Sequence, residues 1–202
     1  AEKLNVPVLE VPRSRLDKLT NGAAHNGVAA RVRDIPTYSL EELLKRQKND
    51  KGFYVALDGI QDPHNLGAIL RTADCAGADG VIITRHHSAS LTPAAVKAST
   101  GAAYTVPVAQ VTNLSQALKT LKDNGFWIAG TDMKDARDYR EGMYEEPTVL
   151  VIGSEGKGIS PLVKKQCDYM VTLPMHGSVT SLNASVAAAI LMYEVEARRR
   201  IS

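Results

Sequence analysis

Three stretches of the sequence combine glycine with amide, carboxylate, hydroxyl or guanidinium side chains. They are DPHNLGAILRTAD (62–74), VIGSEGKGI (151–159) and LPMHGSVTSLNASVAAAILMYEVEARRR (173–200). Such side chains can hold and orient the polar groups of a ligand, and glycine lets the backbone approach a ligand closely. Each stretch is therefore a candidate part of a binding or catalytic site.

The first stretch is typical of a helix that begins beside a ligand. Pro63 and Asn65 predict a turn, and Asn65 is a candidate N-cap of the helix that follows. Gly67 lets this helix start close to another group. Arg71 follows Asn65 by nearly two helical turns and is embedded among apolar residues, so it needs a carboxylate or phosphate partner. The alternative is a capped helix with a solvated arginine.

The second stretch follows an apolar run and is rich in glycine. Gly153, Gly156 and Gly158 have the spacing G-x-x-G-x-G, which differs from the dinucleotide fingerprint G-x-G-x-x-G after a first strand. Lys157 is followed by glycine, so the phosphate loop G-x-x-x-x-G-K-[ST] does not match either. The stretch predicts a turn that brings backbone close to a ligand, with Glu155 at its tip, or an ordinary tight turn with an exposed glutamate.

The third stretch crowds polar residues into one turn before a long helix. These residues are Gly177, Ser178, Thr180, Ser181 and Asn183. One N-cap needs only one such side chain, and a helix N-terminus also offers free N–H groups to a carboxylate or phosphate. The alternative is a helix with surplus capping residues. The alanines at 187–189 indicate tight packing, and the arginines at 198–200 suit a solvated helix C-terminus.

Other kinds of chemistry find no support in the sequence. The five histidines form no i, i+4 pair and no H-E-x-x-H motif, so we expect no metal site. No G-x-S-x-G motif of a serine hydrolase is present. Cys75 and Cys167 belong to no C-x-x-C pair, and we expect them to be reduced thiols of a cytoplasmic protein.

Strands and helices alternate in the part of the chain that must position these residues. Short, nearly continuous apolar runs predict strands at 53–60, 80–85, 105–111, 126–132, 148–154 and 169–174. Helical stretches lie at 65–77, 92–100, 113–125, 159–167 and 181–200. This order predicts an α/β fold, with a mostly parallel sheet and helices on both faces. Ligands of such folds bind at the carboxyl ends of the strands, where the three stretches lie.

Residues 1–52 differ from this pattern and have a mild basic excess. We expect strands at 5–12 and 27–32, a helix at 13–20, a turn at 21–27, and a short helix capped by Ser39. We interpret 1–33 as the remnant of an accessory module, 34–52 as a linker with one helix, and 53–202 as the main domain. Because the chain starts with alanine and a strand-like stretch follows at once, we expect the natural protein to extend further at its N-terminus.

Composition narrows the function classes. The chain has 202 residues, of which 44% are hydrophobic and 23% charged, and this excludes a disordered or collagen-like chain. Only 5% are aromatic, which argues against a platform that stacks single-stranded bases. The net charge of +2 means that a nucleic-acid site must come from local clustering. No apolar run is long enough for a membrane span, and no signal peptide opens the chain.

Together, the three stretches resemble the signature motifs of the SpoU/TrmH-type RNA 2′-O-ribose methyltransferases of the SPOUT superfamily. The matching residues are Asn65-x-Gly67-x-x-x-Arg71, Gly153-Ser154-Glu155-Gly156-x-Gly158, and Leu173-Pro174-Met175 followed by Ser181-Leu182-Asn183. They stand in the family's order and the resemblance covers about residues 53–200. Residues 22–32 also resemble the end of the family's small α/β RNA-binding domain, truncated here. Within the family, the chain looks most similar to the bacterial methyltransferases of a 23S rRNA guanosine.

The resemblance implies a fold and a cofactor. Family members have a deep trefoil knot in the C-terminal part, from about residue 150 onward, which gathers the second and third stretches into one pocket. S-adenosylmethionine binds there, mainly through backbone groups. The residues implied for this cofactor are Gly130, Thr131, Gly153, Leu173, Met175, Ser181 and Leu182. The resemblance also implies RNA as partner and a homodimer with the last helix and the knotted region at the interface, in agreement with the alanine-rich face of that helix.

The resemblance further implies the catalytic residues Arg71, Asn65, Glu155 and Asn183. Arg71 is the family's candidate base, although the pKa of arginine exceeds about 12. It either loses its proton beside the sulfonium, or it grips an RNA phosphate and orients the hydroxyl. Glu155 then orients Arg71 or Asn183, and Asn183 positions the ribose. No metal is needed, because the sulfonium is already activated.

Other functions stay open at this point. Within the family, the substrate could be a tRNA guanosine or another rRNA nucleoside instead of a 23S rRNA guanosine. A non-catalytic RNA-binding protein of the same fold is expected to have lost Asn65, Arg71, Glu155 or Asn183, and all four are present. A nucleotide-dependent oxidoreductase is disfavoured by the order of the glycines.

Overall fold

The computed structural model describes residues 6–32, 34–133 and 136–201. The chain divides into two compact units, residues 1–34 and residues 35–202.

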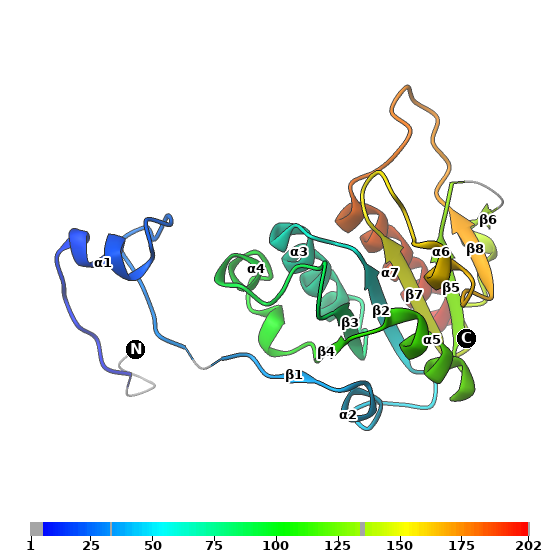
Figure 1. Cartoon of the computed structure of the whole chain (residues 1–202), viewed down its shortest axis with the longest axis horizontal. Coiled ribbons are helices and arrows are strands. Elements are labelled where there is room, and N and C mark those ends of the chain that lie inside the picture. The colour runs from blue at the N-terminus through cyan, green and yellow to red at the C-terminus, as the bar shows by residue number, and fades with distance from the viewer. Residues whose placement is uncertain (1–5, 33, 134–135, 202) are drawn as a thin grey trace. The chain divides into compact units, whose positions relative to one another are not determined.

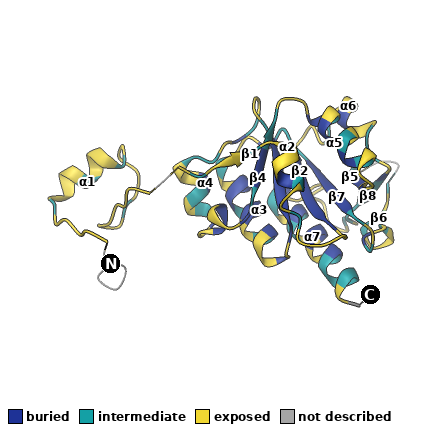
Figure 2. Ribbon diagram, turned by 90° about the horizontal axis from the view of Figure 1, so that it is seen from below, coloured by how far each residue is buried: buried dark blue, intermediate teal, exposed yellow. Residues whose placement is uncertain are grey.

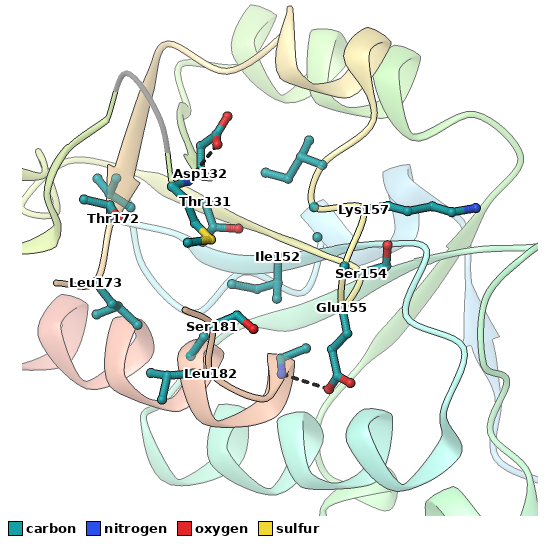
Figure 3. A pocket seen from close by; sticks show the side chains of 18 of the residues that line it. Thr131, Asp132, Ile152, Ser154, Glu155, Lys157, Thr172, Leu173, Ser181 and Leu182 are labelled. Atoms are coloured by element: carbon teal, nitrogen blue, oxygen red, sulfur yellow. Dashed lines mark hydrogen bonds between the residues drawn. The ribbon is translucent and has the colours of Figure 1, made fainter. Parts of the chain in front are cut away.

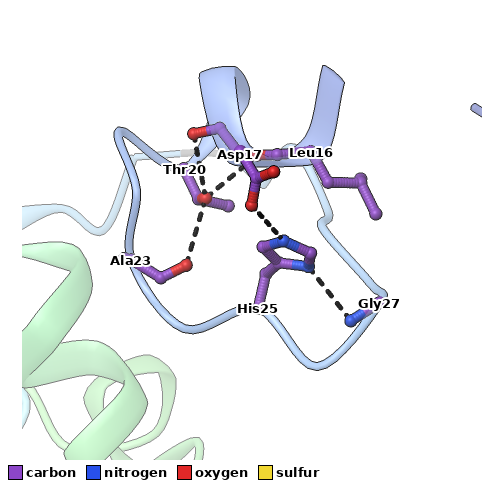
Figure 4. Close-up of polar contacts among 6 residues, drawn as sticks. All are labelled: Leu16, Asp17, Thr20, Ala23, His25 and Gly27. Carbon is purple, nitrogen blue, oxygen red and sulfur yellow. Dashed lines mark hydrogen bonds and ion pairs between the residues drawn. The ribbon is translucent and has the colours of Figure 1, made fainter. Parts of the chain in front are cut away.

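A network of polar contacts organises the described residues of the first unit. Helix α1 (Arg13–Leu19) ends where the Thr20 hydroxyl donates to the carbonyl of Leu16 at 2.9 Å. The ring of His25, only 5% exposed, pairs with the Asp17 carboxylate at 2.9 Å, and its Nδ1 accepts from the backbone of Gly27 at 3.0 Å (Figure 4). These bonds fold the turn that follows α1 back onto the helix.

The helix predicted at 13–20 is confirmed, but the two strands predicted beside it are not. Residues 6–12 and 27–32 have no strand pairing, and Val8, Leu9, Val28 and Val32 are exposed. Asn5, the first residue of the predicted strand, lies outside the described residues. Apolar alternation indicates a strand only where a neighbour supplies the hydrogen-bond ladder and a core, and the described residues of this unit supply neither.

The larger unit is built on one parallel sheet (Figure 1). Within the described residues its strand order is β1-β4-β3-β2-β7-β5-β8-β6, and every pair of neighbouring strands is parallel. The strands are β1 (Thr37–Tyr38), β2 (Phe53–Asp58), β3 (Gly80–Thr84), β4 (Val108–Val111), β5 (Trp127–Thr131), β6 (Arg137–Asp138), β7 (Thr148–Gly153) and β8 (Tyr169–Thr172). The six predicted strands are confirmed. β1 and β6 were missed, because two residues show no periodicity.

Helices cover both faces of the sheet, as the alternating pattern predicts (Figure 2). They are α2 (Leu40–Leu44), α3 (Pro63–Cys75), α4 (Pro93–Ala98), α5 (Leu114–Asp123), α6 (Pro161–Lys164) and α7 (Ala184–Ile201). One apolar core lies between the sheet and α3, α4 and α7, and a second lies between the sheet and α2, α5 and α6. The central strands β2 and β7 pair from Phe53↔Thr148 to Asp58↔Gly153 and are buried on both faces.

The segment 34–52 does more than link two domains. Ser39 and Glu42 form a capping box that starts α2, as the sequence indicates. Leu43 of this helix is fully buried in the second core, and β1 pairs with β4 and forms one edge of the sheet. From Ile35 onward this segment therefore packs as part of the larger unit.

The end of α7 differs from the solvated arginine cluster that the sequence suggests. The Arg199 guanidinium donates to the backbone carbonyls of Lys51, Gly52, Tyr144 and Glu146. Arg198 bonds the carboxylate of Glu194 and a backbone carbonyl. A run of arginines can thus close a helix end against neighbouring backbone rather than point into water. In the described part of the chain, no helix combines the length and the apolar character that a bilayer crossing requires.

Candidate functional site

A cavity of about 440 Å³ opens at the carboxyl ends of β5, β7 and β8, beside the start of α7 (Figure 3). This volume lies within the range of about 300–1,000 Å³ that small-molecule sites usually have. Three loops form its wall, at 131–133, 152–159 and 171–182, and Ala187 and Leu191 of α7 close its floor. The second and third stretches of the sequence therefore line a single pocket, at the edge of the sheet where an α/β fold binds its ligands.

The glycine-rich loop doubles back on itself after β7. The backbones of Ser154 and Gly158 exchange two hydrogen bonds, at 2.9 and 3.1 Å, and Gly156 and Gly158 have φ of +82° and +65°. A Cβ added to Gly153 would lie 2.2 Å from the carbonyl carbon of Gly158. Gly153 is therefore required by the returning loop itself, and a valine there would displace the loop before it met any ligand.

Glu155, at the tip of this loop, is the centre of a hydrogen-bonded cluster. Its Oε1 accepts from Nδ2 of Asn183 at 2.8 Å, from Nδ2 of Asn65 at 3.2 Å and from the backbone N–H of Ala184 at 3.2 Å. Nδ2 of Asn183 also donates to Oδ1 of Asn65 at 3.0 Å. One residue from each of the three stretches thus meets at the first turn of α7, whose free N–H groups favour a carboxylate.

Asn183 has two tasks. Its Oδ1 accepts from the backbone of Ser185 at 2.9 Å and of Val186 at 3.3 Å, which caps α7, while its amide nitrogen joins the Glu155 cluster. Ser181 and Thr180, which the sequence offered as surplus capping residues, line the cavity instead. Of the polar residues before α7, Asn183 therefore caps the helix, and Thr180 and Ser181 form part of the cavity wall.

The sequence was wrong about which residue caps α3. Oδ1 of Asp62 accepts from the backbone of His64 at 2.9 Å, and Pro63 occupies the first turn. Asn65 lies inside this turn, 9% exposed, and its side chain is free to bond Glu155. Gly67 does allow a close approach, because its missing Cβ would lie 2.5 Å from the carbonyl oxygen of Ala95 in α4.

Arg71 is not where its apolar neighbours in the sequence suggest. Its side chain is exposed, it does not line the cavity, and the described residues give it no hydrogen bond or ion pair. Ile69, Leu70 and Ala73 face the core from the same helix, and Arg71 lies on the helix surface between their rows. The structure shows the alternative that the sequence left open, a solvated arginine on a capped helix, and gives Arg71 no carboxylate partner among the described residues.

Two family models match the chain, one in its N-terminal part and one in the larger unit. The SpoU rRNA methylase family matches residues 52–193, and the model for RNA 2′-O ribose methyltransferase substrate binding matches residues 1–38. The chain belongs to the SpoU rRNA methylase family. The resemblance that the three stretches carry is confirmed.

Relatives and solved structures agree with this membership. A TrmH family tRNA/rRNA methyltransferase of Staphylococcus aureus (strain COL) is 50% identical over 98% of this chain and 81% of its own length. One of Bacillus subtilis (strain 168) is 47% identical over 98% of this chain and 80% of its own length. The structure of the SpoU methyltransferase AviRb from Streptomyces viridochromogenes in complex with the cofactor AdoMet has a TM-score of 0.75 and 31% identity, over 83% of this chain and 67% of that one. The A. aeolicus TrmH/SpoU tRNA modifying enzyme has a TM-score of 0.69 and 34% identity, over 80% and 84%.

For this family member, most residues implied for the cofactor lie around the cavity. The ones that line it are Thr131, Gly153, Leu173, Met175, Ser181 and Leu182. Gly130 does not. A Cβ on it would meet Cys167 Sγ at 2.7 Å, on the side of β5 that faces away from the pocket. Burial raises the pKa of the Cys167 thiol to about 12, so this cysteine stays protonated and unreactive at neutral pH.

Further residues of the cavity wall were missed by the sequence argument. They include Asp132, Ile152, Lys157, Ile159 and Thr172. Most of them stand directly beside a motif residue, so extending each motif by one or two positions would have found them. Leu191 was not named from the sequence, and Ala187 was named only for tight packing, because the packing of α7 under the loops is what places both at the pocket.

Proposed function

We propose that this chain transfers a methyl group from S-adenosylmethionine to the 2′-hydroxyl of a ribose in RNA, and that the target is a guanosine of 23S rRNA. One observation carries the proposal: a pocket large enough for a small cofactor lies directly beside the cluster of Asn65, Glu155 and Asn183. A methyl donor and its acceptor must come within about 3–3.5 Å, and the shared wall at Glu155 allows this.

The pocket suits S-adenosylmethionine. Leu173, Leu182 and Ile152 offer apolar contacts for the adenine ring and the aliphatic chain, and the loop 153–158 exposes its backbone to polar groups. Thr131 and Ser181 add hydroxyls at the same wall. When bound, S-adenosylmethionine supplies a methyl group on an activated sulfonium, so no metal ion is required. Support for the cofactor also comes from the AdoMet complex of AviRb, 31% identical to this chain.

The cluster provides rigid hydrogen bonding where the ribose must lie. Oε1 of Glu155 is held by three donors, which leaves its second oxygen for a new partner. That oxygen is suited to accept the bond of the 2′-hydroxyl and to take its proton as the O–C bond forms. A weak base suffices for this step, because an alkylated hydroxyl is strongly acidic. Asn65 and Asn183 fix the orientation of the carboxylate.

Arg71 serves this reaction best as a phosphate contact. It is solvated and lies outside the cavity proposed for the sulfonium, so it is poorly placed to take a proton from a hydroxyl beside that cavity. An exposed arginine on the helix that carries Asn65 is well placed to bind the RNA backbone bidentately. Of the two roles that the family resemblance leaves open, the structure therefore supports the grip on phosphate over the proton transfer.

The remaining parts of the proposal concern assembly and substrate. Val186, Ile190 and Tyr193 form an apolar stripe on α7, and they are 47%, 36% and 50% exposed. We assign to this stripe the homodimer contact. It replaces the alanine run, since Ala187 lines the cavity and Ala188 is buried. We further propose that the chain from about residue 150 forms the family's trefoil knot and that the enzyme acts in the cytoplasm. The match of residues 1–38 to a substrate-binding model supports RNA as partner.

Two experiments test the proposal. Calorimetric titration with S-adenosylmethionine should give one site per chain. Leu182→Trp, which adds bulk to the pocket wall, should abolish this binding, and Leu162→Trp, at an exposed position of α6, should not. Mass mapping of methylated nucleotides in RNA from a deletion strain should then show one 2′-O-methylguanosine missing from 23S rRNA. A methylation missing from tRNA would assign tRNA as the substrate instead. An unchanged map would refute the enzymatic function.

A further inference from the structure

A second cavity, of about 290 Å³, adjoins the first. It is lined by Gly59, Ile60, Gln61, Asp62, Asn65, Ser154, Glu155 and Lys157. Three of these residues, Ser154, Glu155 and Lys157, also line the larger cavity, so Glu155 stands in the wall between the two. A ligand in one cavity can therefore reach a ligand in the other across this carboxylate.

The second cavity lies where the order of the strands reverses. From β2 the chain continues outward through β3 and β4 on one side, and β7 pairs with β2 on the other side. The loop after β2 and the loop after β7 diverge here, which opens a crevice at the carboxyl edge of the sheet. In open α/β sheets such a switch point is a preferred place for a ligand. Gly59, with φ of +74°, lets the first loop turn away at once.

Several polar groups at this crevice keep unused hydrogen-bonding capacity. Among the described residues, the Gln61 amide and the Lys157 ammonium have no partner. Asp62 uses Oδ1 for the backbone of His64, and its second oxygen bonds nothing in the described chain. The cavity thus presents a carboxylate that can accept two hydrogen bonds, an amide that can donate, and one positive charge. Convergent polar groups of this kind mark a site that orients its ligand.

We propose that this second cavity receives the base of the target nucleotide and that Asp62 and Gln61 select guanine. The inference rests on the proposed ribose methylation, and it adds how the substrate is chosen. Guanine presents two adjacent N–H donors and one carbonyl acceptor on its Watson–Crick edge, and single-stranded bases are read on that edge. The Asp62 carboxylate accepts from the two donors, and the Gln61 amide donates to the carbonyl. Adenine, cytosine and uracil each lack the adjacent pair of donors.

The test uses mononucleotides as probes. 5′-Guanosine, 5′-inosine and 5′-adenosine monophosphates are titrated into the full chain, with and without S-adenosylhomocysteine, and the Gln61 side-chain amide is followed by NMR. We expect guanosine monophosphate to bind about tenfold more tightly than adenosine monophosphate, since a good bidentate base contact is worth about 1–3 kcal/mol. The inosine compound, which lacks the exocyclic amino donor, should fall between them.

Asp62→Asn gives the sharpest variant. Asparagine caps a helix as well as aspartate does, so α3 should keep its stability, but the free acceptor becomes a donor. The preference for guanosine monophosphate should disappear. Asp74→Asn, at the other end of α3 and outside the cavity, is the matched control and should keep the preference.

Two outcomes overturn the inference: equal affinity for the three nucleotides in the unmodified chain, or an unchanged preference in Asp62→Asn. If S-adenosylmethionine still binds the first cavity in either case, the proposed methyl transfer survives and the base site alone is wrong. If guanosine monophosphate is preferred but S-adenosylmethionine does not bind, the proposed function fails instead. Lys157→Ala should weaken all three nucleotides equally, because a charge contact to phosphate carries no base information.

Discussion

The two ends of helix α7 hold their neighbours in opposite ways. At the first turn, Asn183 and Glu155 bond through side-chain groups, and Glu155 also lines both cavities. At the last turns, Arg199 donates to four backbone carbonyls, and its guanidinium lies over the ring of Phe53. Burial lowers the pKa of Arg199. The backbone carbonyls that it bonds accept hydrogen bonds from the charged guanidinium and so compensate for this burial.

The comparison separates a functional end from a structural end of one helix. The helix dipole favours a carboxylate at its start and a cation at its end, so both ends are electrostatically matched. What differs is the spare capacity: Glu155 has an oxygen without a partner in the described chain, whereas Arg199 ties α7 to the segments around Lys51 and Glu146. Substitutions at the start should therefore change chemistry, and substitutions at the end should change stability.

The largest effect is expected for Glu155→Gln. Glutamine keeps the acceptor that the two asparagines bond, but it cannot take a proton. Methyl transfer should fall by about 10²–10⁴-fold, the usual value of a positioned acid–base group, while the melting temperature changes little. Single-turnover transfer of labelled methyl to rRNA measures it. A near-normal rate would assign Glu155 a purely structural task.

At the opposite end, Arg199→Ala should cost about 2–4 kcal/mol of unfolding free energy, since it leaves four carbonyls without a charged donor. Denaturant unfolding gives this value, and titration at low temperature should show S-adenosylmethionine affinity within twofold of the parent chain. Arg200→Ala is the control, because Arg200 is exposed and has one long ion pair, 3.7 Å from Glu196. Equal losses for the two variants would remove the distinction between the ends.

Arg71 lies on α3, outside both ends of α7, and Arg71→Ala tests whether it contacts the RNA. If Arg71 grips phosphate, the RNA concentration for half-maximal transfer should rise about tenfold, and saturating RNA should restore the rate. Arg71→Lys should fall between, as lysine keeps the charge but loses the bidentate fork. A rate that no RNA concentration restores would return Arg71 to the proton-transfer role.

The smallest effect concerns Tyr144, next to the structural end. Its hydroxyl is buried and has no hydrogen-bond partner among the described residues, and burial raises the pKa of Tyr144 above its usual value of 10.0. A raised folded-state pKa means that stability is complete below pH 10 and is lost as the pH rises further. Tyr144→Phe should gain about 1 kcal/mol and move alkaline unfolding upward. Stability is followed by circular dichroism in pH titrations of both proteins. A Tyr144→Phe variant less stable than the parent chain would contradict this prediction.

The strands and helices of the larger unit could be predicted because their signals are local. Apolar runs such as 148–153 report burial on both faces, and Ser39 with Glu42 reports a helix start. The motif residues Asn65, Glu155 and Asn183 could also be named in advance. What the sequence could not tell is how their hydrogen bonds are shared. Asn65 suggested a cap, and the structure gives that task to Asp62, one turn earlier.

The errors share a physical cause. The exposure of Arg71 and the burial of Arg199 depend on which neighbours the fold brings, since the two side chains are identical in charge and length. The strands predicted at 5–12 and 27–32 needed partners that the described residues do not contain. The second cavity arises where two loops diverge at a reversal of the strand order. These loops are far apart in the sequence, so no local motif predicts that they form one cavity.

The most direct test of the central claim, that the start of α7 holds the reacting ribose, is single-turnover methyl transfer by Asn183→Asp. Aspartate keeps the N-cap oxygen that Ser185 and Val186 bond, so α7 and S-adenosylmethionine affinity should be kept, while the lost amide donor should lower the unfolding free energy by about 1–3 kcal/mol. The amide donor to Glu155 and Asn65 is replaced by a second negative charge, so transfer should fall by about 10²–10⁴-fold. Transfer at the parental rate, with the fold and the cofactor site intact, would contradict the claim.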